Sequence, residues 1–182
     1  MEVAVLDTSV LFPFLLRDAL LDIALARLYV AHWSPGILDE LSRNLVKHGQ
    51  STEQQAARLV VAMNKVFPSA LVTGYEPRTP AMTNHPKGRH VLAAAVEIGA
   101  TVIVTTNLRD FRPAALEPHN LVARSPGAFL GGLAVTQPAR VAAVLRKQAA
   151  RYRTPPMSFE ELLAHLNLHA PTLIPQLTED VL

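Results

Sequence analysis

The hydrophobic pattern begins with a run of four apolar residues, 3–6, that stops at Asp7 and is followed by Thr8 and Ser9. A short continuous apolar run is typical of a strand that is buried on both faces of a parallel sheet. Open α/β sheets bind ligands at the carboxyl ends of their strands, so Asp7 is a candidate site residue. The alternative is that Asp7 only caps the helix that follows.

A second apolar run at residues 101–105 predicts another buried strand, and Thr106, Asn107 and Asp110 follow it. Three shorter segments could add strands to the same sheet. They are residues 30–33, 71–73 and 121–123.

Apolar residues recur at helical spacing between these segments, and Ser-Pro, Ser-Thr and glycine signals mark many of the helix ends. The expected helices lie at about residues 10–17, 18–29, 34–48, 51–67, 89–98, 125–132, 138–152 and 158–168. The segment 74–88 is rich in proline, threonine, asparagine and glycine, which indicates a loop.

Strands and helices alternate as far as residue 132, which favours an α/β fold with a parallel sheet covered by helices on both faces. We therefore expect an α/β domain at residues 1–132. Residues 133–182 contain helical patterns and no strand pattern, so they form a C-terminal helical extension.

The composition places the chain among globular proteins, because 49% of its 182 residues are hydrophobic. The absence of cysteine excludes disulfides and thiolate metal sites and suits a cytoplasmic protein. Asp7 interrupts the first apolar run, so we expect no signal peptide. No apolar run reaches the roughly 20 residues of a membrane span.

The formal net charge is only +2, but five basic residues lie between residues 135 and 159 without an acid among them. They are Arg140, Arg146, Lys147, Arg151 and Arg153. Such residues are ordinary charges of a helix surface or contacts for RNA or a partner protein, and the sequence leaves both interpretations open.

Three carboxylates are placed to meet at one edge of the sheet: Asp7 after the first strand, Glu40 in a helix and Asp110 after the second clear strand. Oxygen ligands are what Mg²⁺ or Mn²⁺ prefers, and such an ion can activate water against a phosphodiester. The short polar residues that would support this metal site are Thr8, Ser9, Thr106 and Asn107.

Four motifs in this order resemble those of the PIN domain, a family of metal-dependent ribonucleases that includes the VapC-type toxins. They are Val-Leu-Asp-Thr-Ser at 5–9, Leu-Asp-Glu-Leu at 38–41, Arg-His-Val-Leu-Ala-Ala-Ala at 89–95 and Val-Thr-Thr-Asn-Leu-Arg-Asp-Phe at 104–111. The resemblance covers roughly residues 1–130, and the helical tail is similar to the C-terminal extension of one VapC subgroup.

The resemblance implies a PIN-like α/β/α sandwich whose catalytic and metal-binding acids are Asp7, Glu40 and Asp110, with Asn107 as a further polar member. It also implies a toxin endoribonuclease of a type II toxin–antitoxin system, which uses Mg²⁺ or Mn²⁺. Its partners would be an RNA substrate, a cognate antitoxin and a second copy of the chain in a homodimer.

The chain departs from the family where an acidic pattern, Asp-Pro-x-Asp-Arg-His, precedes the third motif. Here the segment reads His85-Pro86-Lys87-Gly88-Arg89-His90, so both acidic positions are lost at His85 and Gly88. A smaller acidic set should bind a divalent ion more weakly, although His85 could assist. Whether Gly88 is natural or an engineered inactivating change stays open.

Three functions therefore remain in view. The first is the nuclease, with impaired activity, in which Arg89 and His90 either contact RNA phosphates or cover the fold. The second is a catalytically inactive PIN scaffold that binds RNA or an antitoxin. The third, an unrelated nucleotide-binding domain, lacks the usual glycine-rich phosphate loop.

Overall fold

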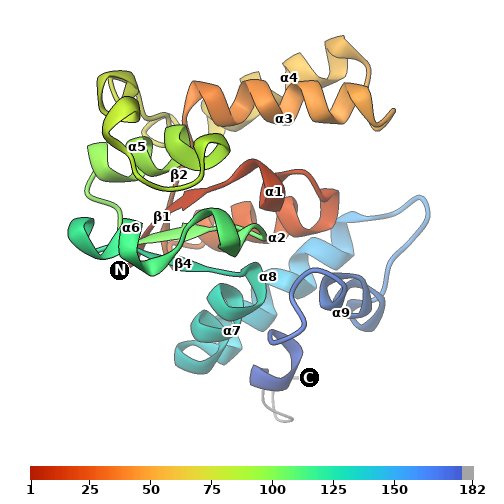
Figure 1. Ribbon diagram of the computed structural model, residues 1–182. Helices are drawn as coiled ribbons and strands as arrows, with labels where there is room; N and C mark the ends of the chain where they lie inside the picture. The colour runs from red at the N-terminus through yellow and green to blue at the C-terminus, as the bar shows by residue number, and fades with distance from the viewer. Residues whose placement is uncertain (178–182) are drawn as a thin grey trace.

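A parallel sheet with strand order β2-β1-β3-β4 lies at the centre of the computed structural model, which describes residues 1–177 (Figure 1). The strands are β1 (Val3–Leu6), β2 (Val30–His32), β3 (Val102–Val104) and β4 (Val122–Arg124). All pairs are parallel, so the carboxyl ends of the strands share one edge. The predicted α/β class is confirmed.

Helices join these strands and form the C-terminal part of the described chain. The α-helices are α1 (Thr8–Leu11), α2 (Phe14–Leu25), α3 (Pro35–Lys47), α4 (Glu53–Val66), α5 (Arg89–Glu97), α6 (Pro113–Leu116), α7 (Pro126–Thr136), α8 (Pro138–Arg151) and α9 (Phe159–Asn167). The 3₁₀ helices are η1 (Glu76–Ala81), η2 (Pro86–Gly88), η3 (Leu108–Asp110), η4 (Glu117–His119) and η5 (Ile174–Gln176).

The helices form a layer on each face of the sheet. Figure 1 shows α3, α4 and α5 above the sheet, with α7, α8 and α9 below it. The residues of β1 from Ala4 to Leu6 and those of β3 are fully buried, as expected for strands that helices cover on both faces. Among residues 1–177, no helix is both long and apolar enough to cross a membrane.

The predicted helix starts at Ser34, Thr52 and Ser158 are confirmed, and each has a side-chain cap. The Oγ of Ser34 accepts a hydrogen bond from the backbone N–H of Ile37 at 3.3 Å, which caps α3. Thr52 with Gln55 and Ser158 with Glu161 form the capping boxes of α4 and α9. Their side chains satisfy backbone N–H groups that have no partner within the helix.

The break between the first two helices lies at Pro13, so the prediction of a helix end near Arg17 is wrong. Proline has no N–H with which to continue the helical hydrogen bonds, so α1 ends at Leu11 with Phe12 as its C-cap. Arg17 lies inside α2 and is only 6% exposed. Its NH1 group donates to the carbonyl oxygen of Leu11 at 2.7 Å, so Arg17 satisfies the end of α1.

The expected strand at residues 71–73 is reduced to one isolated bridge between Leu71 and Trp33. The backbone N–H of Val72 donates to the carbonyl oxygen of Trp33 at 2.8 Å, and the chain then turns at Gly74, whose φ is +78°. The left-handed conformation of Gly74 ends the extended segment. The predicted loop at 74–88 also contains the turns η1 and η2.

Helix α7 continues through Gly131 and Gly132 to Thr136, so the prediction that the glycine pair ends this helix is wrong. A Cβ on Gly131 would lie 2.9 Å from the carbonyl oxygen of Thr172, and one on Gly127 would lie 2.7 Å from the Oγ1 of Thr172. These two glycines therefore allow the C-terminal segment to approach α7 closely.

Polar contacts from α8 bind the C-terminal helices to α2. The Nε2 of Gln148, a buried side chain, donates to the carbonyl oxygen of Leu15 at 3.0 Å. The hydroxyl of Tyr152 donates to the Oδ2 of Asp18 at 2.8 Å. Burial raises the pKa of Tyr152 to about 12, so this hydroxyl stays protonated as a donor.

Arginines of the tail also bind the protein itself. Arg151 forms two hydrogen bonds with the carboxylate of Asp22, at 2.9 and 2.6 Å. Arg140 donates to the carbonyl oxygen of Ala26 at 2.7 Å, and the guanidinium of Arg146 lies 4.5 Å from the centre of the Phe159 ring. These contacts favour the structural interpretation for the three arginines over RNA binding.

Candidate functional site

Asp7 lies directly after β1 with its carboxylate held inside the protein. The residue is 7% exposed, and its backbone N–H donates to the carbonyl oxygen of Val104 in β3 at 3.0 Å. The Oδ2 atom accepts hydrogen bonds from the Oγ of Ser9 and the Oγ1 of Thr105, both at 2.7 Å. Asp7 stands at the N-cap position of α1, yet its side chain makes no capping bond, so the capping interpretation is wrong.

A network of hydroxyl groups fixes the geometry around this carboxylate. The Oγ of Ser9 accepts from the backbone N–H of Thr106 at 3.0 Å, and the Oγ1 of Thr105 accepts from the backbone N–H of Asn107 at 3.0 Å. Each hydroxyl thus gives a hydrogen bond to Asp7 and receives one from the backbone, and the two hydroxyl oxygens lie 3.3 Å apart. The network ties the end of β3 to the end of β1.

Of the predicted supporting residues, Ser9 contacts Asp7 directly, whereas Thr8 donates to the carbonyl oxygen of Ile37 in α3 at 3.2 Å. Thr106 contributes its backbone N–H, and its side chain is exposed. The prediction missed Thr105, which is fully buried. A hydroxyl residue at the end of a buried strand was the available signal.

Asp7 and Glu40 line one cavity of about 300 Å³ at the carboxyl edge of the sheet. Its lining residues are Asp7, Thr8, Ser9, Phe12, Glu40, Asn44, His48 and Asn107. Asn44 and His48, which sequence reasoning missed, follow Glu40 at intervals of four residues along α3 and its C-cap, so they share its face. We call this space the Asp7 cavity.

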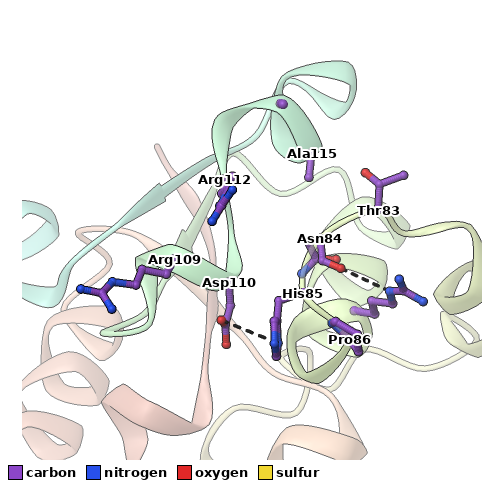
Figure 2. Close-up of a pocket in the computed structure, with 10 residues that line it drawn as sticks. Thr83, Asn84, His85, Pro86, Arg109, Asp110, Arg112 and Ala115 are labelled. Atoms are coloured by element: carbon purple, nitrogen blue, oxygen red, sulfur yellow. Dashed lines mark hydrogen bonds and ion pairs between the residues drawn. The ribbon is translucent and has the colours of Figure 1, made fainter.

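Asp110 lies in a neighbouring cavity of about 550 Å³, at the end of η3. Figure 2 shows His85 and Asp110 facing each other, and the Nδ1 of His85 is 3.7 Å from the Oδ1 of Asp110. In the part of the chain that the structure describes, no three His, Asp or Glu side chains are grouped to hold one metal ion. The structure thus brings Asp7, Glu40 and Asn107 to one cavity and Asp110 to another.

The donors around the Asp7 cavity fit a divalent ion that prefers oxygen. Asp7 and Glu40 supply carboxylates, while Ser9 and Asn107 add a hydroxyl and an amide oxygen. Both hydrogen bonds that residues 1–177 donate to the carboxylate of Asp7 are accepted by its Oδ2 atom. The Oδ1 atom is therefore the one suited to an ion.

The two candidate RNA-binding residues point to different places. Arg89 lines the cavity of Asp110, where its Nε donates to the carbonyl oxygen of Asn84 at 3.3 Å. His90 turns toward the other cavity, and its Nε2 lies 3.6 Å from the Oε2 of Glu40. The two groups are close neighbours, but this distance is longer than a hydrogen bond.

Gly88, at the lost acidic position, is buried beneath Phe111 and Asn84. A Cβ on Gly88 would lie 2.8 Å from the Cζ of Phe111 and 2.9 Å from the Nδ2 of Asn84. Phe111 is 3% exposed, so its ring has little room to move. The local packing is therefore built around a residue without a side chain.

Gly88→Ala should lower the free energy of unfolding by about 1–3 kcal/mol, because the added methyl group overpacks this site. Gly88→Asp should lower the free energy of unfolding by at least as much, because its side chain is larger. Urea unfolding measures the change, with Gly132→Ala as the control, since a Cβ there meets no atom within 4 Å. Equal stability of Gly88→Ala and the unchanged chain would contradict the packing described here.

Comparison with known proteins gives matches over both parts of the chain. The family model of the PIN domain matches residues 3–109, and that of the VapC50 C-terminal domain matches residues 126–173. A Mycobacterium tuberculosis protein named "Putative ribonuclease VapC50" is 40% identical over 103 residues, which are 57% of this chain and 61% of that protein. The match thus spans less than two thirds of this relative. No solved structure matches the chain significantly.

Proposed function

The chain belongs to the PIN-domain family, and from that premise we propose that it is a metal-dependent endoribonuclease, the toxin of a type II toxin–antitoxin pair. One observation carries the proposal. The carboxylate of Asp7 is buried and held by two hydroxyl groups at the wall of a cavity that Glu40 also lines. Similarity to the protein named as a ribonuclease supports the reaction class.

In this proposal Asp7 and Glu40 hold a Mg²⁺ or Mn²⁺ ion, with Asn107 as a further ligand. PIN-domain ribonucleases generally use divalent ions, and such an ion polarises a phosphodiester and activates water. Ser9 and Thr105 orient the carboxylate of Asp7 through its Oδ2. The Nε2 of His90 lies 3.6 Å from the Oε2 of Glu40, whose side chain is 41% exposed.

Asp110 belongs to the proposed site as the remaining acid of the family pattern. Its carboxylate faces His85 in the neighbouring cavity, and η3 connects it to Asn107. We infer that Asp110 contributes less to ion binding than Asp7 does. The loss of acids at His85 and Gly88 supports weak ion binding and weak activity.

The partners proposed from the family are an RNA substrate, an antitoxin and a second copy of the chain. An arginine of the antitoxin would meet the carboxylates of Asp7 and Glu40, because guanidinium and carboxylate groups form strong paired hydrogen bonds. This contact would compete with the metal ion and so suppress cleavage.

Cleavage of total cellular RNA by the purified chain with Mg²⁺, with Mn²⁺ or with EDTA tests the proposal. We expect cleavage with either ion, none in EDTA, and recovery when the ion is added in excess, because the donors of the Asp7 cavity are oxygen atoms. Cleavage that persists in EDTA would contradict the metal dependence. Intact RNA with both ions would contradict the nuclease and favour the inactive scaffold.

A further inference from the structure

The cavity next to the Asp7 cavity is lined by three arginines and is therefore suited to an anion. Residues of two segments form its wall: Thr83, Asn84, His85, Pro86, Arg89, Arg109, Asp110, Arg112, Ala114 and Ala115. Figure 2 shows that the segment from Arg109 to Ala115 faces the segment from Thr83 to Pro86 across this space. We call it the arginine cavity.

Two of the three guanidinium groups have no partner among residues 1–177. Arg109 and Arg112 are exposed and form no hydrogen bond or ion pair with the described part of the chain. Arg89 is anchored through its Nε to the carbonyl oxygen of Asn84. Asp110 is the acid of the lining, and its carboxylate faces His85. Positive charge therefore exceeds negative charge on this wall.

Asn84 belongs to the lining, but its amide group is buried beneath the wall. Asn84 is 6% exposed, and neither the Nδ2 nor the Oδ1 of its side chain has a hydrogen-bond partner among the described residues. Buried amide groups are almost always hydrogen-bonded, since an unpaired one is unfavourable. Both amide atoms are closed off from the cavity, so a bound anion would contact the guanidinium groups of the wall and not this amide.

We propose that the arginine cavity binds a backbone phosphate of the RNA strand next to the linkage held in the Asp7 cavity. Guanidinium groups match phosphate oxygens in charge and geometry. The turn η3 joins the two spaces, because Asn107 before it lines the Asp7 cavity and Arg109 within it lines the arginine cavity. The inference rests on the proposed RNA-cleaving function.

The apolar residues of the lining are small, which favours a phosphate over a protein segment. Pro86, Ala114 and Ala115 are the apolar side chains in the wall. None is aromatic, and none forms the deep apolar pocket in which a protein partner usually buries an anchor residue. A polar strand that carries regular charges fits this wall better.

Binding of a fluorescein-labelled oligouridylate in EDTA tests the proposal without cleavage. Arg109→Gln combined with Arg112→Gln should weaken binding about tenfold, because two charge-assisted contacts are lost. The slope of log affinity against log salt should fall by about 0.7 for each lost phosphate contact. Arg58→Gln is the matched control, since Arg58 is exposed on α4 and lines neither cavity.

Equal RNA affinity and salt slope for the double variant and Arg58→Gln would overturn the proposal. Loss of poly-L-glutamate binding with unchanged RNA affinity would also overturn it and assign the cavity to an acidic protein segment. In cleavage assays with Mn²⁺, the double variant should raise KM and leave kcat nearly unchanged. If the chain cuts no RNA but the binding result holds, the proposed reaction fails while the phosphate site stands.

Discussion

Asp7→Asn should lower the rate of RNA cleavage by more than about 100-fold, which exceeds the usual effect of altering a residue that only supports a metal ligand. The amide oxygen of asparagine can still accept the hydrogen bonds from Ser9 and Thr105. The substitution therefore preserves the local structure and removes the negative charge. That charge is what a divalent ion requires of this residue in the proposed site.

The measurement is the initial rate of RNA cleavage with saturating Mn²⁺, together with the thermal unfolding of each protein. Asp39→Asn is the matched control, because Asp39 is exposed on α3 next to Glu40. We expect the control to keep its activity and both variants to unfold near the temperature of the unchanged chain. Full activity of Asp7→Asn would remove the basis of the proposed function.

Phe129→Ala should lower the free energy of unfolding by about 3–5 kcal/mol, the usual loss when a large aromatic side chain leaves a cavity in a core. Phe129 is fully buried in α7, and its ring lies edge-on to Tyr29 with 4.8 Å between the ring centres. The hydroxyl of Tyr29 donates to the carbonyl oxygen of Leu20 at 2.9 Å. Phe129 thus joins the C-terminal helices to α2 and the start of β2.

Urea unfolding monitored by circular dichroism measures this loss. Phe14→Ala is the control, because Phe14 is 53% exposed at the start of α2, and its removal should change stability by about 1 kcal/mol or less. If the two variants lose the same stability, α7 does not form part of the core of the PIN domain. A second, separate unfolding transition would lead to the same conclusion.

The sequence predicted the sheet well because β1 and β3 are buried on both faces and consist of uninterrupted apolar residues. Helix ends with a local cap were also predictable, as at Ser34. The two ends that failed have different causes. The break between α1 and α2 follows from Pro13, a local signal that the prediction did not take as the helix end. Helix α7 continues past Gly131, and the distant residue Thr172 packs against this glycine.

The residues of the candidate site also include some that local sequence predicts and some that it does not. Residues that follow strands, such as Asp7 and Asn107, were placed at the correct edge because parallel strands end together. The position of Asp110 depends on the turn η3 and on its contact with His85, which no local pattern encodes. Sequence position therefore brought Asp110 near the site but did not fix which cavity it lines.

The bond between Thr105 and Asp7 joins residues 98 positions apart, and Asp7 also pairs through its backbone with Val104. During synthesis Asp7 leaves the ribosome long before Thr105, the residue that orients its carboxylate. A nascent chain that stops short of β3 therefore lacks the arrangement proposed for cleavage. In the proposed function, an incomplete translation product would therefore not cleave RNA.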